Sequence, residues 1–130
     1  MPANDHAAFA LFKSYIRDAS GISEDEFNLI AHFLRPVHFN KGAVVLEIGS
    51  VCAHAFHVTR GLLRVATLDK NGDEHIVQFA PEGWFASDRS SMYFQEPSHL
   101  RIDAIEDTDA VMVGQDYFDA LATISETFRK

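Results

Sequence analysis

Glycines recur at regular intervals through the middle of the chain, and this spacing limits the fold more than any other feature. Successive glycines in the set Gly42, Gly49, Gly61, Gly72 and Gly83 are mostly 11 or 12 residues apart. Short β-rich runs lie between and after them: Ala43–Glu47, Ala55–Thr59, Leu62–Leu68, His75–Phe79, Leu100–Ile105 and Ala110–Val113. Such runs, divided by glycine turns, are typical of an antiparallel sandwich or barrel. The Asn71-Gly72 pair predicts a hairpin turn, because it readily takes positive φ.

Helical patterns flank the strand region on both sides. Apolar residues at helical spacing predict a helix over Ala7–Asp18, with Asp5 as its N-cap. Ser23 and Glu26 form a capping box for a second helix, which Pro36 ends. The first helix carries Phe9, Phe12 and Ile16, and the second carries Phe27, Ile30, Ala31 and Leu34.

A helical pattern returns over Gln115–Leu121, and Ser125-Glu126 predicts the start of a further helix. We therefore expect one domain over residues 1–130 of a mainly β (α+β) class. Its centre is an antiparallel double-stranded β-roll, or jelly roll, over residues 36–114. N-terminal helices within 5–35 and a C-terminal helix within 115–130 flank it. Because a helix starting at Ser125 is cut short at Lys130, we expect the natural protein to continue.

Composition excludes several classes of function. The chain has 11 basic and 19 acidic residues and a net charge of −8, with no basic run, so by itself it is a poor candidate for binding DNA or an anionic membrane. Cys52 is the single cysteine, so no intrachain disulfide forms. No signal peptide and no apolar run of about 20 residues is present, and we expect a cytoplasmic protein.

The order and spacing of short motifs resemble the cyclic-nucleotide-binding domains of the cyclic-AMP receptor and of Crp/Fnr-type transcription regulators. The resemblance covers roughly Phe39 to Leu121. Its markers are Lys41-Gly42, Glu47-Ile48-Gly49, Phe56-His57-Val58-Thr59-Arg60-Gly61, Lys70-Asn71-Gly72-Asp73-Glu74, Pro81-Glu82-Gly83-Trp84-Phe85 and Ala104-Ile105-Glu106-Asp107. None is specific alone, but together they are a strong indication of this family.

In this family a phosphate-binding cassette carries a Gly-Glu-Leu-type stretch, with an arginine ten positions after the glutamate. Counted without gaps from Gly83, that stretch falls on Ser87-Asp88-Arg89, and the arginine position falls on Ser98. The acid is therefore kept in shortened form as Asp88, while the phosphate-binding cation is replaced by a serine. The resemblance implies a candidate ligand pocket formed by Gly83, Trp84, Phe85, Ser87, Asp88, Arg89, Ser98 and His99.

The replacement at Ser98 disfavours a cyclic nucleotide as the ligand. A cyclic phosphodiester is anionic, and an arginine fork binds it through two parallel charge-assisted hydrogen bonds. A serine supplies one neutral donor, and the loss costs about 2–5 kcal/mol. Arg89 and Arg101 are nearby substitutes in the sequence, although strand alternation places Arg101 on the face opposite Ser98. Cyclic nucleotide binding is thus disfavoured without being excluded, and no cofactor is certain.

Each candidate residue also has a purely structural interpretation. Asp88 accepts a hydrogen bond from a ligand hydroxyl, caps a short helix, or does both. Ser98 and His99 line a pocket or only begin a strand, with the strand favoured. Trp84 and Phe85 are better explained as core residues that close the roll. If they fill the pocket together with Met92, the chain is a stand-alone interaction module without a ligand.

The sequence gives little support to catalysis or metal binding. A third hypothesis, a cupin-like metal-binding protein, needs converging imidazoles and a carboxylate. The seven histidines are scattered, and His54 and His57 are three apart, which on a strand sends them to opposite faces. Cys52 has no evident partner for nucleophilic catalysis. We expect no metal site and no enzyme activity.

The leading hypothesis is the effector-sensing regulatory domain of a Crp/Fnr-like transcription regulator with a degenerate nucleotide pocket. The family resemblance implies a small-molecule effector and a homodimer in the full-length protein. It also implies contact with DNA only through a helix-turn-helix domain that would follow Lys130.

Overall fold

The computed structural model describes the backbone of residues 2–124 and the side chains of residues 10–19 and 21–124. The expectations for the side chain of Phe9 and for a helix at Ser125-Glu126 lie outside these residues. The first helix begins at Pro2, so the prediction that Asp5 is its N-cap is wrong. No helix within the described residues is long and apolar enough to cross a membrane.

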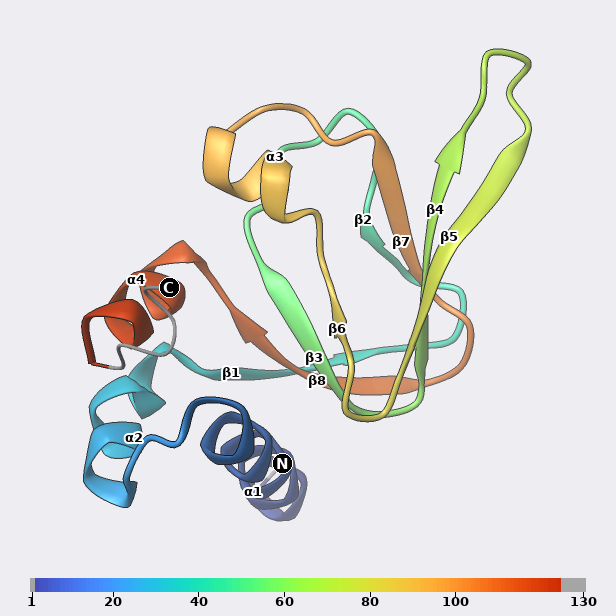
Figure 1. Cartoon of the computed structure of the whole chain (residues 1–130). Helices are drawn as coiled ribbons and strands as arrows, with labels where there is room; N and C mark the ends of the chain where they lie inside the picture. The colour runs from blue at the N-terminus through green and yellow to red at the C-terminus, as the bar shows by residue number, and fades with distance from the viewer. Residues whose placement is uncertain (1, 125–130) are drawn as a thin grey trace.

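Helices lie at both ends of the chain and once between strands. They are α1 (Pro2–Ser20), α2 (Glu24–Ile30), the 3₁₀ helix η1 (Ala31–Phe33), α3 (Arg89–Phe94) and α4 (Gln115–Ile124). The predicted capping box is confirmed at α2: Ser23 Oγ accepts from the Glu26 amide at 3.1 Å, and Glu26 Oε1 accepts from the Ser23 amide at 2.9 Å. In Figure 1, α1, α2 and α4 gather on one side of the sheets.

In the part of the chain that the structure describes, eight strands form two antiparallel four-stranded sheets, which confirms the predicted β-roll. One sheet has the order β1-β8-β3-β6 and the other the order β2-β7-β4-β5. The strands are β1 (Arg35–Phe39), β2 (Val44–Leu46), β3 (Ala55–Arg60), β4 (Leu62–Leu68), β5 (Glu74–Pro81), β6 (Phe85–Ala86), β7 (Leu100–Ala104) and β8 (Thr108–Val113). The hairpin of β4 and β5 extends away from the helices in Figure 1, and its turn contains the predicted Asn71-Gly72 pair.

The sequence misses two of these strands. β1 starts at Arg35, immediately after η1, and includes Pro36. A proline is tolerated there because β1 is an edge strand, paired only with β8. β6 has only two residues, too few to produce an alternating pattern.

The strand β3 separates two hydrophobic clusters, so both of its faces are buried. Phe56 and Val58 point into the roll, while Ala55 and His57 face the helices. The helix-side cluster contains Phe12, Ile16, Ile22, Phe27, Ile30, Leu34, Ala55, Val111, Val113, Tyr117 and Leu121. This cluster fixes α1 and α4 beside the start of the segment that carries the candidate site.

Candidate functional site

The cassette (residues 83–99) runs through β6 and α3 to the start of β7, and Asp88 holds it together. Asp88 Oδ1 accepts from the Ser91 amide at 3.0 Å, which caps α3 at its N-terminus. Asp88 Oδ2 accepts from Ser98 Oγ at 2.6 Å. The N-cap interpretation of Asp88 is therefore confirmed, and Ser98, the residue that the count from Gly83 placed at the family's arginine position, is bonded directly to Asp88.

Ser98 is held on every side by the protein's own groups. It is 2% exposed. Its amide donates to Ser50 O at 2.8 Å, its carbonyl accepts from the Gly49 amide at 2.8 Å, and its Oγ accepts from the Leu100 amide at 3.0 Å. β7 begins at Leu100, so Ser98 precedes the strand rather than beginning it. The hydroxyl is already engaged before any ligand arrives.

A second set of hydrogen bonds ties the cassette to the loop between β2 and β3. Ser91 Oγ accepts from the Cys52 amide at 2.9 Å and donates to the Glu96 carbonyl. Ser87 Oγ donates to the His54 carbonyl at 3.2 Å, and Cys52 Sγ donates to the same carbonyl at 3.1 Å. The buried Cys52 thiol therefore has a structural hydrogen bond.

The other predicted pocket residues do not join this network. Trp84 is 57% exposed, so its predicted core position is wrong: the residue lies in the turn before β6, where its amide and carbonyl bond to Pro81 O and the Val58 amide. Phe85 packs on the helix side of the sheet, 5.0 Å from the His57 ring, instead of closing the roll. Gly83 bonds through its amide to Val58 O, and the exposed His99 through its carbonyl to Thr67 Oγ1.

The two arginines considered as substitutes are engaged elsewhere. Arg101 Nε lies 3.4 Å from Glu47 Oε1, and its Nη1 lies 3.7 Å from Asp103 Oδ2. The guanidinium carbon of Arg89 lies 3.7 Å from the centre of the Phe118 ring on α4. Each cation thus has a partner other than Ser98.

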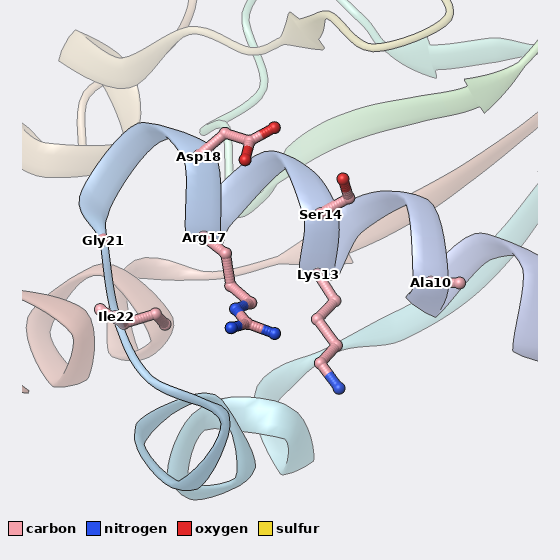
Figure 2. A pocket seen from close by; sticks show the side chains of 7 residues that line it. All are labelled: Ala10, Lys13, Ser14, Arg17, Asp18, Gly21 and Ile22. Atoms are coloured by element: carbon pink, nitrogen blue, oxygen red, sulfur yellow. The ribbon is translucent and has the colours of Figure 1, made fainter.

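A hollow of about 520 Å³ lies along α1, and two cations, Lys13 and Arg17, line it (Figure 2). Figure 2 shows Lys13 and Arg17 on one side of the helix, and Ser14 and Asp18 on the other. Both cations pair with Glu24 of α2, Arg17 Nη1 at 3.2 Å from Glu24 Oε2. The hydrogen bond from Lys13 lowers the pKa of Glu24. These charges join two helices and leave no cation for a ligand.

Among the side chains that the structure describes, no group of three or more His, Cys, Asp or Glu residues is placed to hold a metal ion. The buried His57 packs against aromatic rings, while His38 and His75 bond to Asp109 and Asp69 respectively, each at 2.7 Å.

Removing the Asp88 carboxylate is expected to destabilise the chain. Asp88→Ala deletes the N-cap of α3 and an acceptor of the buried Ser98 hydroxyl, which together cost about 2 kcal/mol. Asp88→Asn keeps one oxygen for capping and is expected to cost less than half of this. Urea unfolding of the three proteins measures the difference, and equal stability of Asp88→Ala and the wild type would show that the network is not significant.

The two packed sheets, the cassette helix between β6 and β7 and the flanking helices define a β-roll with helices at both ends. The family model described as "cyclic nucleotide-binding domain" matches residues 36–125. The chain belongs to the cyclic nucleotide-binding domain family, and its structural relatives include Crp/Fnr regulators. A search of curated proteins finds no match to the chain.

Three solved structures illustrate the likeness. The catabolite activator protein of Thermus thermophilus is 17% identical with a TM-score of 0.69, and the match covers 79% of this chain and 48% of that one. The sensor domain of the transcriptional regulator DNR from Pseudomonas aeruginosa is 17% identical (TM-score 0.72; 88% and 77% covered). The regulatory subunit of a cAMP-independent protein kinase A from Trypanosoma cruzi, bound to guanosine, is 14% identical (TM-score 0.73; 87% and 41%). This chain thus spans about half the length of the Thermus protein.

Proposed function

We propose that the chain is the effector-sensing domain of a Crp/Fnr-like transcription regulator whose cassette no longer binds a cyclic nucleotide. The observation that carries this proposal is the 2.6 Å hydrogen bond from Ser98 Oγ to Asp88 Oδ2. In a nucleotide-binding relative, the residues at these two positions would hold the phosphate and the sugar. Here their side chains bond to each other instead of to a ligand.

The energetics support the same conclusion. A nucleotide entering the cassette would have to separate Asp88 from Ser98 and would gain no cation at the Ser98 position in exchange. Burial of an uncompensated anion is costly, and the missing arginine contact removes about 2–5 kcal/mol, or roughly one and a half to three and a half decades of affinity. The guanosine-bound relative supports the view that this fold accepts ligands without a cyclic phosphate.

Signalling by such a domain is a shift between conformations. An effector that binds one arrangement of the roll and its helices more tightly than another changes the population of each. We propose that this change passes to a homodimer and a DNA-binding domain in a longer cytoplasmic protein. With a net charge of −8, this chain itself is not the part that contacts DNA.

The test is calorimetric titration with cyclic AMP and cyclic GMP. The wild-type chain is expected to give a dissociation constant weaker than about 1 mM for both. A variant with Ser87→Gly, Asp88→Glu and Ser98→Arg restores the family pattern and is expected to gain affinity by two decades or more. Ser90→Arg places the same cation at an exposed cassette position and is expected to gain nothing. Micromolar binding by the wild type would overturn the proposal.

One observation favours a second function, an interaction module without any ligand. Met92 of the cassette helix α3 is 1% exposed and packs in the cluster inside the roll, so the cassette itself fills part of the interior. Replacing Met92 by alanine separates the two functions. If the roll opens a ligand site, the smaller side chain should alter effector binding, whereas a module without a ligand should only lose stability.

A further inference from the structure

A cavity of about 280 Å³ lies between α1, the start of the cassette and α4, on the helix side of the sheet. Four of its ten lining residues are aromatic: Tyr15 comes from α1, Phe85 from β6, and Tyr117 and Phe118 from α4. Neither Asp88 nor Ser98 lines the cavity, so their hydrogen bond lies outside it. Small-molecule sites typically combine such apolar walls with a few polar groups.

The first candidate polar group is the hydroxyl of Tyr117, a residue that lines the cavity. The residue is 0% exposed, and its Oη is buried without a hydrogen-bond partner. Leaving a buried hydroxyl unpaired costs about 1–3 kcal/mol, so such a group calls for an explanation. Burial raises the pKa of Tyr117, which keeps the hydroxyl protonated and able to donate.

The second polar group is the guanidinium of Arg89, which also lines the cavity. It lies 3.7 Å from the centre of the Phe118 ring and forms no ion pair with any carboxylate that the structure describes. Arg17, Arg64 and Arg101, in contrast, each pair with a carboxylate. Arg89 therefore offers a cation to a ligand beside an aromatic wall.

We propose that this cavity binds a small aromatic carboxylate. The ring of the ligand packs between the aromatic side chains of α1, β6 and α4, its carboxylate pairs with Arg89, and an oxygen at its other end accepts a hydrogen bond from Tyr117. This site goes beyond the proposed function. It shares Phe85, Ser87 and Arg89 with the candidate nucleotide pocket but includes neither Asp88 nor Ser98, so it does not depend on whether the cassette binds a cyclic nucleotide. A ligand here would touch α1, the cassette and α4 at once.

The experiment titrates the whole chain with 4-hydroxybenzoate and 3-(4-hydroxyphenyl)propionate, which present the same two groups at different separations. Binding is measured by calorimetry and by protein NMR. At least one probe is expected to bind with a dissociation constant of about 0.1–1 mM, which is ordinary for a ligand of this size. Methyl 4-hydroxybenzoate lacks the carboxylate charge and benzoate lacks the phenolic oxygen, so each is expected to bind less tightly.

Two variants and two matched controls assign the contacts. Arg89→Gln is expected to weaken binding of the acid about tenfold and to leave the methyl ester unaffected. Tyr117→Phe is expected to weaken it about fivefold without affecting benzoate, and it removes an unpaired hydroxyl, so the fold should persist. Arg60→Gln and Tyr93→Phe change exposed residues outside the cavity lining and are expected to bind as the wild type does.

Saturable binding that depends on Arg89 and Tyr117 supports the proposal. It is overturned if neither acid binds the wild-type chain at 5 mM, or if the affinity is the same in the wild type and in both cavity variants. Addition of cyclic AMP during the titration is expected to leave the affinity unchanged, which keeps this result separate from the test of the cassette.

Discussion

Alanine in place of Gly61 is expected to lower the free energy of unfolding by about 4 kcal/mol, through a strained backbone and a steric clash. Gly61 joins β3 to β4 with a φ of +103°, which side chains rarely adopt. A Cβ atom there would lie 2.4 Å from the Asp107 carbonyl oxygen and 2.8 Å from the Thr108 Cα. Because both are backbone atoms at the start of β8, they cannot move without disturbing the sheet.

Gly72→Ala is the matched control. Gly72 has a φ of +83°, but a Cβ atom would have no neighbour within 4 Å. This substitution is expected to cost only the backbone term, about 1 kcal/mol. Urea unfolding of both variants separates the strain of a positive φ from the close approach of β8. Similar losses in the two variants would contradict the account given for Gly61.

The regular glycines made the roll predictable, because each turn is a local property of the chain. The predicted run Leu62–Leu68 matches β4, and the capping box at Ser23 lies where the pattern places it. Local patterns fail where the context is tertiary. Arg35–Phe39 forms a strand although it contains a proline. Proline has no backbone N–H to donate, but this strand lies at the edge of the sheet and pairs only with β8, so the missing donor is tolerated.

The candidate site was predictable as a segment but not as a set of contacts. Counting from Gly83 identified Asp88 and Ser98 from the sequence. The hydrogen bond that joins them was not predicted, because it depends on how the cassette folds between them. The position of Trp84 could not be read in the same way, because its exposure depends on a turn and a two-residue strand. The aromatic cavity was missed because Tyr15, Phe85 and Tyr117 come from three distant parts of the chain.

Lowering the pH from 7 to 5 is expected to destabilise the protein by about 2 kcal/mol through one histidine, His57. His57 is 0% exposed among the rings of Phe12, Tyr15 and Phe85, and neither of its ring nitrogens has a hydrogen-bond partner. Burial lowers the pKa of His57 from 6.5 to about 4, and a weaker interaction with the Gly83 backbone opposes this shift. The neutral ring is therefore the form that the folded chain accommodates.

The sign follows from proton counting. Between pH 6.5 and about 4 the unfolded chain binds a proton at His57 that the folded chain does not, so stability falls as the pH falls. His38 acts in the opposite direction, because hydrogen bonds to Asp109 and Asn40 raise its pKa and favour its charged form in the folded chain. The stability that His38 contributes is present at low pH and is lost as the pH rises through its raised pKa.

His57→Leu isolates the effect of the buried ring. The variant keeps an apolar side chain of similar size against the aromatic rings and is expected to lose most of the destabilisation between pH 7 and pH 5, as measured by urea unfolding at each pH. His99→Gln changes an exposed histidine and is expected to keep the wild-type dependence. An unchanged pH dependence in His57→Leu would mean that His57 titrates normally in the folded chain. The aromatic cluster beside the proposed cavity would then have to admit a charged ring, and an apolar ligand wall there would lose its support.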